Sequence, residues 1–208
     1  MEAIYSIAAI FVLLCISEIG WRKHWLANEF GRKFVHVTVG SFVAFWPFFL
    51  GWDEIRLLSL AFLVVVVLSK QLHVFRAINS VQRPTYGEAL FAVSVGLLTF
   101  ITHSKGIYAA AILQMSLADG FAAIAGTRYG VGNKYHVLSQ TKSAAGTATF
   151  AVTSLALLVG YAAYSVAGLS VTGVLVGMVG ATVLENLGVF GIDNLLVPTF
   201  IGLLLAHI

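Results

Sequence analysis

Four polar residues near the start of the chain are spaced three and four positions apart: Glu29, Arg32, Lys33 and His36. A helix would present them on one face. Adjacent cations at a helix end suit an anionic phosphate chain, because arginine offers a forked contact and lysine a point charge. The alternative is a basic cluster that orients the protein and binds lipid headgroups. His36 extends the pattern into an apolar stretch, which favours a functional site.

Asp119 lies inside another apolar stretch and is flanked by small residues, including Gly120 and Gly126. Small residues allow helices to approach each other closely in a membrane. They also leave room for a phosphate group or a metal ion beside the carboxylate. Because a packing face alone has no need of an aspartate, we interpret Asp119 as a functional residue.

A third group, formed by Lys142, Ser143 and Gly146, lies where a further apolar stretch begins. The first turn of a helix presents unpaired N–H groups and a positive potential, which bind anions. We expect Lys142 and Ser143 to contact phosphate, although Ser143 would equally serve as a simple helix cap. The segment is not the phosphate loop of soluble nucleotidases, because the upstream glycine of that motif is missing.

Glu185, Asp193 and Asn194 flank a short polar segment before the last apolar stretch. They offer the hard oxygen ligands that magnesium accepts, usually together with phosphate oxygens and water. The alternative is a polar turn that caps the last helix. We favour a metal site shared by Asp119, Asp193 and Glu185.

The composition excludes an ordinary soluble domain. Hydrophobic residues make up 59% and charged residues 10% of the 208 positions, and the mean hydropathy is +0.93. A soluble domain is closer to half apolar. The sequence predicts an all-α bundle of about eight membrane helices, with seven as the alternative, in a single domain over 1–208. The expected helices are 3–20, 35–51, 55–70, 87–102, 106–126, 145–167, 170–186 and 195–208.

Basic residues are distributed unevenly among the connections between these helices. Odd-numbered connections hold ten lysines and arginines, and even-numbered ones hold only Arg56 and Lys105. This bias predicts that odd-numbered connections are cytoplasmic and that both termini lie outside. The four polar segments then share the cytoplasmic side, as one site requires. The net charge of +3 is explained by this topology and by anionic partners, not by nucleic acid.

The four segments, in this order, resemble the membrane family of CTP-dependent lipid kinases. That family includes dolichol kinase, phytol kinase and yeast-type diacylglycerol kinase, and it is related to phosphatidate cytidylyltransferases. The resemblance covers about residues 29–200. Its markers are E-x-x-R-K-x-x-H at 29–36, an aspartate followed by small residues and a glycine at 119–126, K-S-x-x-G at 142–146, and E-N followed by G-x-D-N-x-x-V-P at 185–198.

The resemblance implies a nucleotide site with a defined set of residues. Its expected members are Arg32, Lys33, Asp119, Gly126 and Lys142, together with Ser143, Gly146 and Asn194. The sequence departs from the family at Ala118, where a glycine is usual, and a methyl group there narrows the space for a phosphate. The cytidylyltransferase signature is absent after residue 146, which favours phosphoryl transfer over synthesis of a CDP-lipid.

We therefore expect a kinase that transfers the terminal phosphate of CTP to a long isoprenoid alcohol of the phytol, polyprenol or dolichol type. The reaction is placed at the cytoplasmic membrane face, with Mg²⁺ or another divalent cation. The expected catalytic residues are Asp119, Lys142 and His36, with Glu29 as a further member of the site. The alternatives are a cytidylyltransferase, a diacylglycerol kinase, and a transporter of lipids or ions.

A separate motif, Gly173-x-x-x-Gly177, is typical of close helix packing in membranes. It predicts a helix contact either within one chain or between the two chains of a homodimer.

Overall fold

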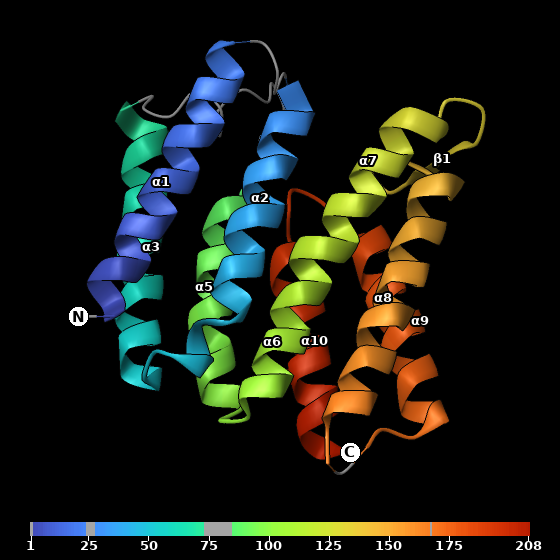
Figure 1. Cartoon of the computed structure of the whole chain (residues 1–208). Coiled ribbons are helices and arrows are strands. Elements are labelled where there is room, and N and C mark those ends of the chain that lie inside the picture. The colour runs from blue at the N-terminus through green and yellow to red at the C-terminus, as the bar shows by residue number, and fades with distance from the viewer. Residues whose placement is uncertain (1, 24–27, 73–84, 167) are drawn as a thin grey trace.

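The computed structural model describes residues 2–23, 28–72, 85–166 and 168–208. Seven side chains within its helices lie outside the description: Trp21, Asn28, Glu29, Arg32, Lys70, Gln71 and Leu72. The described residues form a bundle of helices with a small β-hairpin at one end (Figure 1).

Eight helical segments make up the described part of the chain. They are α1 (Glu2–Arg22), α2 (Asn28–Ala44), α3 (Trp52–Leu72), α5 (Gly87–Ile101), a continuous segment from α6 to α7, α8 (Ala144–Tyr164), α9 (Val171–Leu187) and α10 (Asp193–His207). The continuous segment joins α6 (Lys105–Leu113), the π-helical turn η2 (Gln114–Ala118) and α7 (Asp119–Tyr129). A 3₁₀ turn, η1 (Trp46–Phe48), follows α2.

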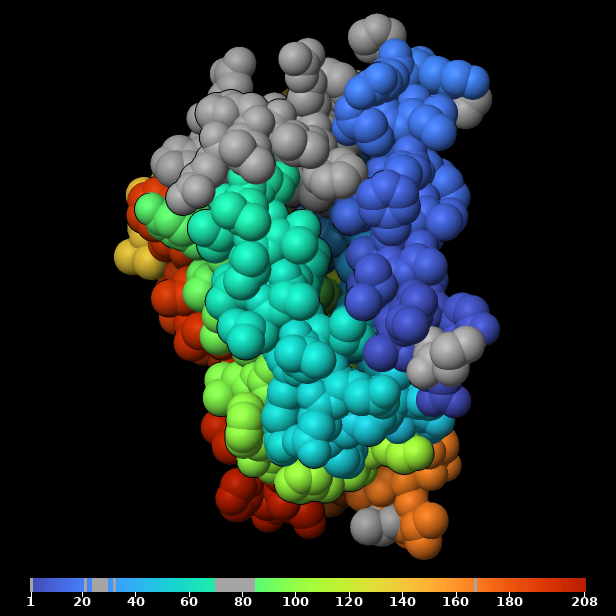
Figure 2. All heavy atoms as spheres, turned by 90° about the vertical axis from the view of Figure 1, so that its left-hand side faces the viewer, coloured from blue at the N-terminus to red at the C-terminus, as the bar shows by residue number. Residues whose placement is uncertain are grey.

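Among the described residues, three stretches are long and apolar enough to cross a membrane: Glu2–Gly20, Lys105–Tyr129 and Ala144–Tyr164. Shorter apolar helices accompany them. Helices α1 and α3 face the viewer in Figure 2. Both helices carry exposed side chains that suit lipid: Ile4, Phe11, Ile16, Leu57, Leu60 and Val64. The predicted all-α membrane bundle is confirmed, and the protein is an integral membrane protein.

Two features differ from the expected element boundaries. Helix α2 begins at Asn28 instead of at 35, so the polar segment 29–36 is helical throughout. The connection between α7 and α8, expected as a loop, contains the antiparallel strands β1 (Lys134–Val137) and β2 (Gln140–Ser143). Such a short pair of strands has too weak a sequence pattern to be recognised beside strongly apolar helices.

The two ends of the bundle carry different parts of the chain (Figure 1). The start of α1 and the end of α10 lie in the lower half of the picture, together with the connection between α5 and α6. The top of α2, the hairpin and the connection between α9 and α10 lie toward the opposite end. The polar segments predicted to share one side of the membrane therefore do gather at one end of the bundle.

The centre of the bundle is the segment from α6 to α7, which packs against α2, α8 and α10. Fully buried side chains along these elements include Tyr108, Phe150, Leu158 and Ile201, and Trp46 in η1 is buried beside them. Glycines set the closest approach of α2, because a β-carbon on Gly40 would overlap Ser116 and one on Gly120 would overlap Val37. This tight contact positions α2 beside Asp119.

The Gly173-x-x-x-Gly177 motif has its contact inside the chain. A β-carbon on Gly177 would lie 2.9 Å from Leu158 in α8 and 3.2 Å from Leu204 in α10. The motif therefore serves packing of α9 within the bundle, and nothing in the structure supports the predicted homodimer.

Replacing Gly120 with alanine is expected to lower the free energy of unfolding by about 1–3 kcal/mol, because the added methyl group overpacks the contact with Val37. The matched control is Gly160→Ala in α8. Within the described part of the chain, a β-carbon there meets no atom within 4 Å. That variant should be neutral or slightly stabilising, since alanine is the better helix former. Thermal unfolding in a mild detergent compares the two, and equal midpoints would contradict the proposed tight contact.

Candidate active site

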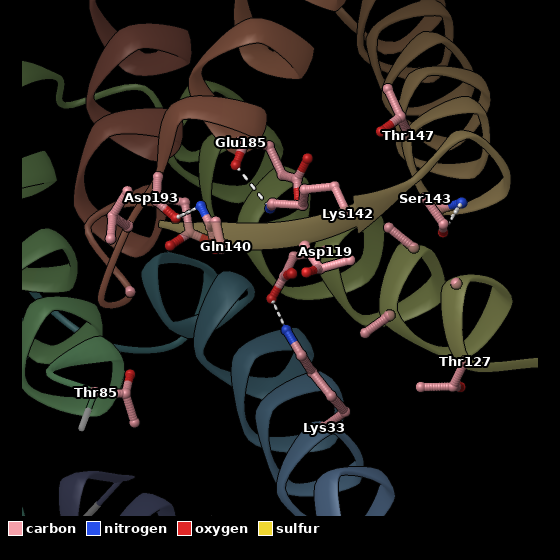
Figure 3. A pocket seen from close by; sticks show the side chains of 18 of the residues that line it. Lys33, Thr85, Asp119, Thr127, Gln140, Lys142, Ser143, Thr147, Glu185 and Asp193 are labelled. Atoms are coloured by element: carbon pink, nitrogen blue, oxygen red, sulfur yellow. Dashed lines mark hydrogen bonds and ion pairs between the residues drawn. The ribbon is translucent and has the colours of Figure 1, made fainter. Parts of the chain in front are cut away.

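A cavity of about 650 Å³ opens between α2, α7, the hairpin, the start of α8 and the connection between α9 and α10. Figure 3 shows its polar side chains converging from these elements. The lining includes most of the predicted site residues: Lys33, Asp119, Gly126, Lys142, Ser143, Gly146, Glu185, Asp193 and Asn194. Segments that are far apart in the sequence therefore meet in one cavity, as the sequence analysis required.

The first pair of charges in the cavity is Lys33 with Asp119. The Lys33 ammonium donates a hydrogen bond to Asp119 Oδ2 (Figure 3), and the two residues are only 7% and 8% exposed. Burial of either charge alone is costly, so each stabilises the other. Asp119 directly follows η2, and π-helical turns of this kind are frequent at functional sites.

His36 lies one turn along α2 from Lys33 and faces the same carboxylate. Its Nε2 atom is 3.6 Å from Asp119 Oδ2 and 3.2 Å from the carbonyl oxygen of Met115. A carbonyl oxygen only accepts hydrogen bonds, so the imidazole donates to Met115 through an Nε2–H group. In this arrangement Nε2 already carries a proton, and His36 is placed to orient Asp119.

The second pair is Lys142 with Glu185. Lys142 projects from β2, and its ammonium donates to Glu185 Oε1 and, at 2.9 Å, to the Glu185 carbonyl oxygen. Gln140, two positions earlier on the strand, donates to the Gly188 carbonyl oxygen at 2.6 Å. These bonds join the hairpin to the end of α9, and they hold Lys142 at the cavity wall.

Ser143, Gly126 and Gly146 lie where α7 and the start of α8 approach each other closely. The Ser143 hydroxyl accepts a hydrogen bond from the Gly146 N–H at 3.1 Å and so caps α8. A β-carbon on Gly126 would lie 3.0 Å from Ser143 Oγ, and one on Gly146 would lie 3.1 Å from the Ala122 carbonyl oxygen. The helix-cap interpretation of Ser143 therefore fits, and the two glycines let the cavity floor form between closely packed helices.

Asp193 and Asn194 begin α10 at the far wall of the cavity. Asn194 is 5% exposed, and among the described residues its Oδ1 atom has no hydrogen-bond partner. Burying an amide oxygen without a hydrogen-bond partner costs free energy, and a bound ligand or ion that contacts the oxygen removes that cost. Asn194 is therefore the clearest indication in the cavity of a missing ligand atom.

A magnesium ion was expected here, and the donor set fits one. No group of three His, Cys, Asp or Glu side chains is arranged for a metal within the described ranges. Magnesium, however, is commonly held by one or two carboxylates together with substrate phosphate oxygens. Asp193 and the orphaned Asn194 oxygen offer such a partial set, and Asp119 joins it when Lys33 turns to a phosphate. Glu185 is held more firmly, because Lys142 binds both its carboxylate and its carbonyl oxygen.

The side chains of Glu29 and Arg32 lie outside the described residues, although both positions belong to α2. Ala118 is fully buried and is not part of the cavity lining, so its methyl group does not narrow the space for a phosphate.

The sequence analysis missed several lining residues, among them Thr85, Gln140 and Phe190. Thr85 and Gln140 are isolated polar residues in connections, and no spacing distinguishes them. The position of Phe190 could have suggested a site residue, because it stands in a glycine-rich turn, next to Gly191 and shortly before Asp193.

The structure is that of an integral membrane protein, a helical bundle with lysines and carboxylates gathered in one cavity at one end. The phytol kinase of Synechocystis sp. is 35% identical to this chain over 178 residues, which cover 82% of this chain and 75% of that relative. The chain belongs to the phytol kinase family, and the expectation of a membrane lipid kinase is confirmed. No protein-family profile matches the chain. No solved structure matches it either.

Proposed function

We propose that this protein transfers the terminal phosphoryl group of CTP to the hydroxyl group of an isoprenoid alcohol such as phytol. The similarity to phytol kinase supports the acceptor. The observation that carries the proposal is the single cavity in which Lys33, Asp119 and Lys142 meet, although they come from three separate segments. Phosphoryl transfer depends mainly on positioning and on neutralising charge, and this cavity offers both.

Lys33 and Lys142 bind the phosphate chain in this proposal. The described lining carries Lys33, Lys134 and Lys142 and three carboxylates, so the cavity without a ligand is balanced in charge. An entering triphosphate takes Lys33 from Asp119 and shares Lys142 with Glu185. The released Asp119, with Asp193 and Asn194, would hold a magnesium ion. When bound, that ion would supply positive charge that offsets the charge of the phosphates.

His36 and Glu185 act in this proposal by positioning Asp119 and Lys142. His36 orients Asp119 through its ring nitrogen. Glu185 holds Lys142 at the cavity wall in the absence of nucleotide. Arg32 is proposed as an additional phosphate contact on sequence grounds alone, because it precedes Lys33 in the same helix.

The active site faces the cytoplasm in this proposal. Ten of the 12 lysines and arginines lie in or beside the odd-numbered connections expected from the sequence. Among the described residues, three of these ten line the cavity: Lys33, Lys134 and Lys142. Basic connections are retained on the cytoplasmic side of membranes. The apolar acceptor reaches the cavity from the bilayer, so that only its hydroxyl group has to enter the polar site.

The decisive experiment supplies the purified protein in detergent or in vesicles with labelled CTP or ATP and a panel of lipid alcohols. The panel contains phytol, a polyprenol and diacylglycerol. A phosphorylated isoprenoid alcohol together with free CDP supports the proposal. Release of pyrophosphate with a CDP-lipid would support a cytidylyltransferase instead, and the absence of any modified lipid would favour a transporter.

Asp193→Asn is expected to raise the magnesium concentration needed for half-maximal activity by at least about tenfold, because one carboxylate ligand of a hard cation is lost. Activity at saturating magnesium should recover in part. Titration of activity with MgCl₂ after chelator treatment measures this shift. Glu185→Gln serves as the comparison, since Glu185 is bound to Lys142, and it should shift the nucleotide KM and leave the magnesium requirement nearly unchanged.

A further inference from the structure

A tight turn joins α9 to α10 at the cavity wall, and its backbone is unusual. The Ile192 N–H donates to the Val189 carbonyl oxygen at 3.1 Å, which closes a turn with Phe190 and Gly191 at its centre. Both central residues have positive φ angles, 56° for Phe190 and 86° for Gly191. Turns of this kind strongly favour asparagine or glycine at such positions, and a bulky side chain there is an outlier. The chain therefore keeps a large aromatic ring where a glycine would be less strained.

The start of α5 fixes this turn in place. The Phe190 carbonyl oxygen accepts a hydrogen bond from the Tyr86 N–H at 2.9 Å. Gly191 packs directly against Gly87, since a β-carbon on Gly191 would lie 2.6 Å from the Gly87 Cα atom. The position of the Phe190 ring is thus set by its backbone. Strained backbone of this type is concentrated at ligand-binding sites, where the strain is part of the function.

The ring itself is available to a ligand. Phe190 lines the same cavity as Lys33, Asp119 and Lys142, and it is 55% exposed. Most of the other lining residues are polar, charged or small. Phe190 is followed by Asp193 three positions later, so their Cα atoms are at most about 11 Å apart. A ligand with a charged end near Asp193 and a flat apolar end near Phe190 would match both residues chemically.

We propose that the Phe190 ring is the platform on which the nucleobase of the nucleoside triphosphate stacks. This inference rests on the proposed function and specifies its donor subsite. An aromatic face binds any planar base by stacking, and the strained turn holds that face toward the cavity. Phe190 then aligns the base, while Lys33 and Lys142 hold the phosphates. The residue determines affinity for the nucleoside part of the donor.

The test compares Phe190→Ala with Leu138→Ala. Leu138, at the tip of the hairpin, is also exposed and also has a positive φ of 52°, but it does not line the cavity. Phe190→Ala should raise the KM for CTP by roughly five- to a hundredfold, which corresponds to the loss of one stacked base, and leave kcat within a few fold. Phe190→Trp, which keeps an aromatic ring, should have a KM for CTP close to that of the wild type. Inhibition by inorganic tripolyphosphate, which has no base, should be unchanged in every variant.

Phe190→Gly separates the ring from the backbone. It removes both the ring and the strain, so its unfolding midpoint should equal or exceed that of the wild type, and its KM for CTP should rise as in Phe190→Ala. A KM for CTP within twofold of wild type in both variants overturns the proposal. A raised KM for the lipid alcohol with an unchanged KM for CTP also overturns it, because the ring would then contact the acceptor. Equilibrium binding of a labelled nucleotide without lipid tests the platform even if no lipid alcohol is phosphorylated, so this inference and the proposed function fail separately.

Discussion

Asp119→Asn is expected to lower phosphate transfer by at least about 10²–10³-fold. The substitution keeps the size of the side chain and removes its charge. It takes away the carboxylate proposed to hold magnesium beside the transferred phosphate, and it leaves the Lys33 ammonium without its buried partner. The rate of lipid phosphorylation at saturating CTP and magnesium measures the effect.

The loss of a buried partner also affects folding, so the design needs a second variant. Asp119→Asn alone should lower the unfolding midpoint, because Lys33 stays buried without a carboxylate. The double variant Lys33→Gln with Asp119→Asn removes both charges and should recover much of that stability while remaining inactive. Recovery of activity in the double variant would contradict a catalytic role for Asp119. The control is Asp53→Asn, an exposed aspartate at the opposite end of the bundle, which should behave as wild type.

The membrane architecture, and the meeting of the polar segments in one cavity, were largely predictable. Apolar runs indicated the helices, because a hydrocarbon environment tolerates few other patterns. The alternation of basic connections predicted that Lys33, Asp119, Lys142 and Asp193 lie on one side of the membrane. A small number of charges in an apolar chain is itself informative, since each one needs a partner or a function.

The pairing of those charges was not predictable. Glu185 was predicted as a metal ligand and Lys142 as a phosphate contact, and in the structure the two side chains bind each other. Which cation meets which carboxylate depends on the relative depth and rotation of α2, α7, β2 and α9. Those variables are set by packing contacts such as that between Gly120 and Val37, which no pattern within a single segment encodes.

Phe190 was missed for a different reason. Its importance follows from a backbone angle and from exposure inside a cavity, and both are properties of the folded chain. In the sequence it is one of 15 phenylalanines in an apolar protein. Only its place in a glycine-rich turn before Asp193 distinguishes it.

The paired lysines explain how one cavity can be stable both without and with an anionic substrate. Burying the ammonium groups of Lys33 and Lys142 without carboxylate partners would cost free energy. Asp119 and Glu185 remove that cost in the absence of nucleotide. In the proposal, a triphosphate and magnesium offer Lys33, Lys142 and Asp119 new partners at the same time, and Glu185 keeps its hydrogen bond to the Lys142 ammonium, which has three donors.

Lys142→Gln tests this exchange most directly, and we expect kcat/KM for CTP to fall by roughly 10²–10³-fold. Glutamine keeps a hydrogen-bond donor near Glu185 and loses the charge that neutralises phosphate in the transition state. Lys142→Arg should give an intermediate value, because it keeps the charge on a side chain of different shape. Lys105→Gln, at the exposed start of α6 on the opposite end, is the matched control and should retain full activity. Steady-state kinetics with CTP as the varied substrate distinguishes these outcomes.

If Lys142→Gln keeps kcat/KM within about fivefold of wild type, Lys142 serves only to tie the hairpin to α9 through Glu185, and the phosphate chain is bound elsewhere in the cavity.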